Sequence, residues 1–173
     1  GSELRFLTRT RPRIFTDVIN VTQVQELVRN GWWSPLVYRD QVAIDRKALA
    51  MNSTGADYTD ASVQRHFELT GFVDKLHETV RGLLSEGRQH ILVFTRFVAE
   101  AYRLAQALPC VGVLTAETPP AVRDQILQAF RDRLYLVIVN VGIITEGADF
   151  PDCEFVQLAR PTKSPPWKLP IRR

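Results

Sequence analysis

The chain has 173 residues, of which 45% are apolar and 24% charged, as in a soluble globular protein with one core and at most a small appendage. Its apolar runs are too short to span a bilayer and no signal peptide opens the sequence, so we expect a cytoplasmic protein without a membrane partner. The net charge of +3 comes from basic ends, residues 1–13 and 160–173, because the middle is acidic. Such ends are often solvated tails, but they can also contact phosphate.

The cysteines and histidines point to packing rather than to chemistry. Cys110 and Cys153 both fall in predicted strands, where two buried thiols are expected rather than a disulfide or a metal ligand set. The three histidines, His66, His77 and His90, are scattered, and no Cys/His cluster has zinc spacing. We therefore predict no metal site.

The first third of the chain predicts one helix and a strand joined by loops. The helix begins at Asn20, where Gln23 completes the capping-box spacing, and it ends at Asn30 and Gly31. Trp32 and Trp33 follow in a rigid loop, where packing is favoured over base stacking by roughly three to one. Residues 36–44 alternate as a strand does, and residues 51–58 indicate a loop.

Two further helices are predicted before the core. Thr59 or Asp60 can cap a short helix with Val63 and Phe67 on one face. A longer helix can begin at Thr70 and end at Glu86–Gly87, with an apolar stripe at helical spacing formed by Val73, Leu76, Val80 and Leu83. We expect both helices to pack on the sheet as scaffold.

From residue 90 onward the sequence alternates between strands and helices. Residues 91–94, 111–114, 135–140 and 153–159 are apolar and rich in β-branched side chains, which predicts buried strands. Two helices separate the first three strands. The apolar face of the first is formed by Val98, Ala101, Leu104, Ala105 and Leu108. The second begins at Pro119–Pro120, and its apolar face is formed by Val122, Ile126, Ala129 and Phe130. Strands apolar on both faces predict a parallel α/β sheet covered on both sides.

Each predicted core strand ends in polar residues. These are Thr95–Arg96, Thr115–Thr118, Asn140–Gly142 followed by Thr145–Asp149, and Arg160–Lys163. In an open α/β sheet, ligands bind outside the carboxyl ends of the strands. Hydroxyls, cations and the backbone amides near Gly142 and Gly147 suit phosphate. Asp149 can hold a ribose hydroxyl or cap loop amides, and the spacing favours neither.

The order of these segments resembles a known family. The segments Ile-Leu-Val-Phe-Thr-Arg, Val-Leu-Thr-Ala-Glu-Thr-Pro, Val-Gly-Ile-Ile-Thr-Glu-Gly-Ala-Asp-Phe-Pro and Arg-Pro-Thr-Lys-Ser are similar to the second RecA-like domain of superfamily two helicases, the DEAD/DEAH-type enzymes, and above all to bacterial and phage members. The resemblance is strong over residues 90–164. It implies a RecA-like open parallel sheet flanked by helices on both faces, with an N-terminal helical extension.

The resemblance assigns roles residue by residue. It implies nucleic-acid contacts at Thr95, Arg96, Thr115, Asn140, Thr145, Arg160 and Lys163. It places Gly147 and Asp149 in the ATP cleft between two RecA-like domains. The Asn140–Asp149 segment would then couple the nucleotide state of the cleft to the affinity for the nucleic-acid strand. It implies no catalytic residue within this chain.

Several parts of the family's machinery are missing from the sequence. The phosphate-binding loop Gly-x-x-x-x-Gly-Lys and the acidic motif of the first domain do not occur, and Thr8–Pro12 matches a motif near the end of that domain only in part. Residues 167–173 stand where Gln-x-x-Gly-Arg-x-x-Arg, with its arginine fingers, would follow. The resemblance thus implies ATP and Mg²⁺ in a longer parent, with neither bound tightly here.

We expect four parts. We expect residues 1–13 to be a tag remnant and the end of a first RecA-like domain, and residues 14–88 to form a connecting strand and helices packed on the core. Residues 89–164 should form the RecA-like helicase core, and residues 165–173 a truncated or non-native tail. The expected partners are nucleic acid, with DNA favoured over RNA, the missing first domain, and another copy through the unpaired strand of 36–44. Two alternatives are a stand-alone interaction module and, less favoured, an unrelated enzyme with Glu146 or Asp149 as base.

Overall fold

The computed structural model describes residues 24–32, 34–35, 37, 44–144 and 150–161, which fall into two compact units divided after residue 35. The first unit contains α1 (Val24–Arg29), which confirms a helix in the predicted place. The cap predicted at Asn20 and most of the strand predicted over 36–44 lie outside the described residues. The site lies in the second unit.

The second unit begins with a short 3-10 helix, η2 (Arg46–Ala48), and the predicted loop of 51–58. An isolated antiparallel bridge between Met51 and Tyr58 closes this loop. Inside it the Asn52 side-chain oxygen accepts hydrogen bonds from the Thr54 hydroxyl, the Ala56 amide and the Asp57 amide. The loop is therefore a compact turn held by one asparagine.

Two helices follow the loop, as predicted. The Thr59 hydroxyl caps α2 (Asp60–Thr70) by accepting from the Ser62 amide, and Gly71 separates this helix from α3 (Phe72–Ser85). The predicted stripe of α3 was wrong at its first position, because Phe72 is 3% exposed while Val73 is only half-buried. Phe72 stacks on Phe67 of α2 with ring centroids 4.0 Å apart, and this contact sets which residue faces inward.

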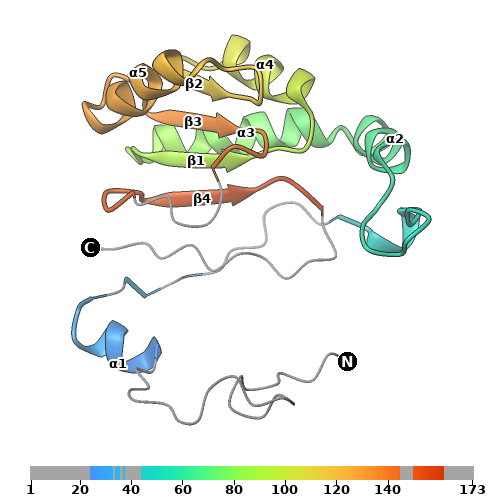
Figure 1. Ribbon diagram of the computed structural model, residues 1–173, viewed down its shortest axis with the longest axis horizontal. Coiled ribbons are helices and arrows are strands. Elements are labelled where there is room, and N and C mark those ends of the chain that lie inside the picture. Colours follow the sequence, from blue (N-terminus) through green and yellow to red (C-terminus); the bar gives the residue numbers. More distant parts are fainter. Residues whose placement is uncertain (1–23, 33, 36, 38–43, 145–149, 162–173) are drawn as a thin grey trace, which may run out of the picture. The chain divides into compact units, whose positions relative to one another are not determined.

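The core is a parallel sheet of four strands in the order β2-β3-β1-β4, and Figure 1 shows all four arrows pointing the same way. The strands are β1 (Ile91–Phe94), β2 (Val111–Leu114), β3 (Val137–Asn140) and β4 (Phe155–Leu158). The helices α4 (Val98–Ala107) and α5 (Pro120–Arg131) connect the first three strands. The predicted alternation of strands and helices is thus confirmed.

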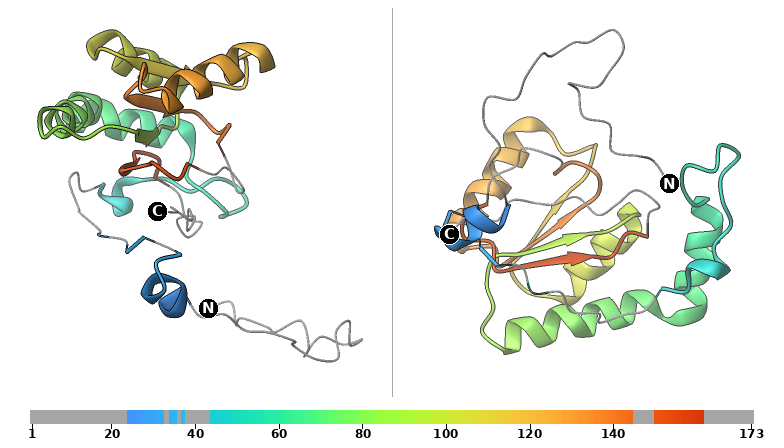
Figure 2. Two further views of the ribbon diagram at one scale, coloured as in Figure 1. Left: turned by 90° about the vertical axis from the view of Figure 1, so that its left-hand side faces the viewer. Right: turned by 90° about the horizontal axis from the view of Figure 1, so that it is seen from below.

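Alternate residues of each strand enter two separate apolar clusters. Ile91 and Val93 pack with residues of α2, α3 and α4, whereas Leu92 packs with Ile138 of β3 and Phe130 of α5. In the right-hand view of Figure 2, α3 and α5 accordingly lie on opposite sides of the strands. This confirms the predicted parallel α/β sheet with helices on both faces.

The ends of the predicted apolar faces differ from the structure. Val98 and Val122 stand in the first turns of α4 and α5 and are 39% and 41% exposed, so they do not belong to the buried faces of these helices. Cys110 is also exposed, and it precedes β2 in a left-handed conformation with φ of 57°, so its predicted burial in a strand was wrong. Cys153 is buried as predicted, although it lies two residues before β4.

No helix in the described part of the chain is long and apolar enough to cross a membrane.

Gly112 in β2 lies under α5 with no room for a side chain. A Cβ at this position would stand 2.6 Å from Ile126 Cγ2 and 3.1 Å from Tyr135 Cδ2. We expect Gly112→Ala to lower the free energy of unfolding by about 1–2 kcal/mol, because overpacking forces neighbours to move. A urea titration checks this. Gly82→Ala in α3 is the control, since open space surrounds Gly82, and it should be neutral or slightly stabilising. Equal effects of the two substitutions would contradict the packing argument.

Candidate nucleic-acid interface at the carboxyl edge of the sheet

The strand register brings the predicted polar residues to one edge of the sheet. Asn140 pairs in register with Phe94 of β1 and Leu114 of β2, and Phe94 also pairs with Leu158 of β4. Thr95, Thr115 and Arg160 therefore follow their strands at nearly the same level as Asn140. Four predicted site residues, Thr145, Gly147, Asp149 and Lys163, lie outside the described residues.

Asn140 is fully buried at the end of β3 and organises the loop that follows. Its side-chain oxygen accepts hydrogen bonds from the amides of Ile143 at 2.9 Å and Ile144 at 2.7 Å, and its side-chain nitrogen donates to the Ile144 carbonyl at 3.3 Å. Gly142 makes the turn with φ of 72°, a conformation that suits glycine. Asn140 thus holds the backbone leading to the predicted coupling segment, with no side-chain surface left for a ligand.

The two threonines at the edge are also buried. Thr115 is 2% exposed, its hydroxyl accepts from the Glu117 amide, and its own amide donates to the Thr118 hydroxyl at 2.9 Å. Thr95 is 1% exposed, and its hydroxyl has no hydrogen-bond partner among the described residues. Thr115 therefore builds a local turn, whereas Thr95 is a buried polar side chain at the edge.

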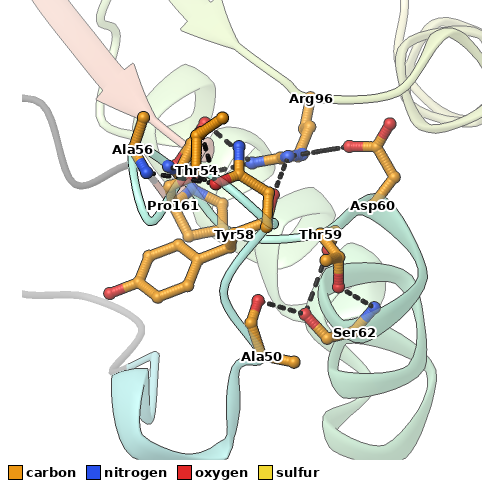
Figure 3. A network of polar contacts seen from close by, with 11 residues as sticks. Ala50, Thr54, Ala56, Tyr58, Thr59, Asp60, Ser62, Arg96 and Pro161 are labelled. Carbon is orange, nitrogen blue, oxygen red and sulfur yellow. Dashed lines mark hydrogen bonds and ion pairs between the residues drawn. The ribbon is translucent and has the colours of Figure 1, made fainter.

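Arg96 extends from the end of β1 into a network of acceptors shown in Figure 3. Its Nε donates to Asp60 Oδ1 at 2.8 Å, and its Nη2 lies 2.7 Å from the same oxygen and donates to the Tyr58 carbonyl at 2.6 Å. Its Nη1 donates to the Pro161 carbonyl at 3.2 Å and to Asp57 Oδ2 at 3.4 Å. We call these five residues the Arg96 network. Its acceptors are up to 65 residues away in sequence, beyond the reach of motif reasoning.

Glu100 is a buried carboxyl that sequence reasoning missed. It lies in the first turn of α4, is 8% exposed, and accepts a hydrogen bond from the Phe97 amide at 3.3 Å. It lines a cleft of about 370 Å³ between α2, α3 and α4 together with Phe67, Phe97 and Arg103. Burial raises the pKa of Glu100 from 4.5 to about 7, against the opposing effects of backbone hydrogen bonds and of the nearby arginines.

The comparison with protein families decides the kind of domain. Residues 73–169, more than half of the chain, match the helicase conserved C-terminal domain. The chain belongs to this family. With the parallel sheet described above, the match confirms the predicted RecA-like helicase C-terminal domain.

Relatives and a solved structure are similar to this helicase C-terminal domain. A 51.5 kDa protein of a Lactococcus phage (isolate 7-9) is 31% identical over 145 residues, which cover 82% of this chain and 31% of the relative. The DNA 3'-5' translocase XPB2 of Sulfurisphaera tokodaii is 41% identical over 76 residues, or 43% of this chain and 17% of the relative. The chain thus spans less than a third of either relative.

The helicase domain of Pyrococcus furiosus Hef is similar at a TM-score of 0.45 and 21% identity, covering 59% of this chain and 25% of the solved one.

In this helicase C-terminal domain the described edge residues fall into two groups, a buried frame and an exposed surface. Asn140, Thr95 and Thr115 are buried, and the side chains of Asn140 and Thr115 bond to loop backbone, while Arg160 is exposed just after β4. No group of three or more His, Cys, Asp or Glu side chains among the described residues is placed to hold a metal ion. The described edge thus presents the exposed guanidinium of Arg160 to solvent.

Proposed function

We propose that this chain supplies half of the ATP cleft and half of the strand-binding track of an ATP-dependent helicase or translocase. The observation that carries the proposal is the family match over residues 73–169, which spans the whole described sheet. ATP and Mg²⁺ would bind between this domain and a first RecA-like domain, with Gly147 and Asp149 on this side of the cleft. The whole protein would act in the cytoplasm.

The nucleic-acid strand would bind along the carboxyl edge of the sheet. Arg160, with Lys163 three residues later, would supply cations for the phosphates. Thr145 would line the same track, whereas the buried Thr95 and Thr115 would form part of its frame. DNA is favoured over RNA because one relative is named a DNA translocase. Since one domain holds only half of the track, the isolated chain should bind weakly and with strong salt dependence.

We expect Arg160→Ala to weaken the binding of a labelled thymidine oligonucleotide by the isolated chain. Loss of one phosphate contact should reduce the slope of log Kobs against log salt by about 0.7, measured by fluorescence anisotropy at several salt concentrations. Arg131→Ala is the control, because Arg131 is also exposed but ends α5, away from the carboxyl edge. An unchanged slope in Arg160→Ala, or an equal loss in both variants, would remove Arg160 from the track.

The same preparation tests the role in ATP hydrolysis. The purified chain should release no phosphate from ATP above background, because half of the cleft belongs to another domain. Turnover that disappears in Asp149→Ala would contradict this assignment. The parent gene gives a second test: an encoded phosphate-binding loop upstream and a Gln-x-x-Gly-Arg motif downstream are expected, and their absence would favour a stand-alone interaction module.

A further inference from the structure

The guanidinium of Arg96 is largely occupied by protein acceptors in this structure. Four of its five N–H groups donate hydrogen bonds, to Asp60, Asp57 and the carbonyls of Tyr58 and Pro161, and Nη2 also lies 2.7 Å from Asp60 Oδ1 in an ion pair. The side chain is only 10% exposed. A phosphate could bind this guanidinium only by displacing these acceptors, and the two backbone carbonyls would then lose a charge-assisted partner.

We infer that Arg96 is a positioning residue of the strand-binding track rather than a phosphate contact. Its acceptors come from two segments far apart in sequence: residues 57–60, where the loop of 51–58 enters α2, and Pro161 after β4. Pro161 directly follows Arg160, so the network fixes the backbone that presents the exposed cation. This inference rests on the proposed strand-binding function.

Burial on both sides of the network supports this assignment. Tyr58 is 7% exposed and bridged to Met51, and Pro161 is buried. The neighbouring ladder is continuous, since the Ala159 amide donates to the Phe94 carbonyl at 2.9 Å. Arg96 thus joins the ends of β1 and β4 to the loop in front of α2.

The two roles of Arg96 predict opposite effects of Asp60→Ala on binding. If Arg96 positions Arg160, removing its principal acceptor loosens the network and weakens single-strand binding, although a negative charge has been lost. If Arg96 contacts phosphate, the same change frees the guanidinium and strengthens binding. The sign of the effect therefore separates positioning from contact.

Asp74→Ala is a matched control for the lost charge. Both aspartates lie in the first turn of a helix, α2 or α3, their side chains are 74% and 77% exposed, and each pairs with one arginine. The Asp74 partner is Arg103, outside the network. We expect oligonucleotide affinity to fall about threefold or more in Asp60→Ala relative to Asp74→Ala, with no change in the salt slope, because no phosphate contact is lost.

Amide exchange tests the positioning without nucleic acid. In Arg96→Ala we expect about tenfold faster exchange at Thr59, which donates to the Ala50 carbonyl, and at Ala159, with partial rescue in Arg96→Lys. Leu136, whose amide donates to the Cys110 carbonyl at the opposite edge, should not change. Faster exchange at all three amides would mean general destabilisation and would overturn the inference.

Each combination of results decides between the two roles. Weaker binding in Asp60→Ala together with faster exchange at Thr59 and Ala159 supports positioning. Stronger binding in Asp60→Ala, or a smaller salt slope in Arg96→Ala, overturns it in favour of a phosphate contact. If the unmodified chain binds no oligonucleotide, the proposed function fails, and exchange alone decides whether Arg96 holds the two segments together.

Discussion

Asn140→Ala should lower the free energy of unfolding by about 3–4 kcal/mol, because it leaves the Ile143 and Ile144 amides and the Ile144 carbonyl without partners. Each unsatisfied buried polar group costs about 1–3 kcal/mol, and water cannot easily replace a side chain that is 0% exposed. Urea denaturation of the purified chain measures the change. The loop that leads from β3 to the predicted coupling segment should also lose its shape, so single-strand binding should fall as well.

Asn52→Ala is the control for this experiment, because Asn52 makes the same kind of contacts in a more exposed place. Its side-chain oxygen also accepts from two amides and one hydroxyl, but the residue is only half-buried. Water can replace these bonds, so the expected loss is about 1 kcal/mol. If Asn140→Ala destabilises no more than Asn52→Ala, burial does not set the strength of these contacts.

The second large effect is a pH dependence of the free energy of unfolding, which originates at Glu100. Its pKa is about 7 in the folded chain and 4.5 in the unfolded chain, because burial in the cleft between α2, α3 and α4 disfavours the charged form. Between these two values the folded chain holds one more proton than the unfolded chain, so stability falls as pH rises. The contribution is complete below pH 4.5, is lost as pH rises through 7, and amounts to about 3 kcal/mol in total.

Glu100→Gln should remove this dependence, because glutamine stays neutral and can still accept from the Phe97 amide. The difference in unfolding free energy between variant and wild type should therefore shift in favour of the variant by about 2–3 kcal/mol from pH 4.5 to pH 7.5. Glu68→Gln on the rim of the same cleft is the control, since Glu68 is exposed. Parallel curves for Glu100→Gln and wild type would show that Glu100 ionises normally.

The sequence predicted the architecture because its signals are local. Short apolar runs rich in β-branched residues, such as 91–94 and 137–140, alternate with helical patterns, which predicts buried parallel strands whose following polar residues meet at one edge. Where two neighbouring residues compete for one helix face the pattern is ambiguous, as at Phe72 and Val73, and the stacking of Phe72 on Phe67 decides between them.

The burial and the hydrogen-bond partners of the site residues could not be predicted in the same way. Spacing places Thr95, Thr115 and Asn140 at the edge, but it does not tell whether a side chain faces solvent or turns into the loop behind it. The Arg96 network depends on residues 36–65 positions away, which only the folded chain brings together. Glu100 left a weak signal: a carboxyl directly before Ala101, which is buried with Leu104 on the inner face of α4.

The strand order also constrains when the sheet can form during synthesis. Among the described residues β1 pairs only with β3 and β4, both of which follow it in the chain, and β2 pairs only with β3. When β1 and β2 have been synthesised, neither can yet pair, because β3 has not been made. The sheet therefore cannot form before residue 140 has left the ribosome. Until then the apolar strand Ile91–Phe94 is exposed to misfolding and to chaperones, so a nascent chain halted before β3 should be aggregation-prone.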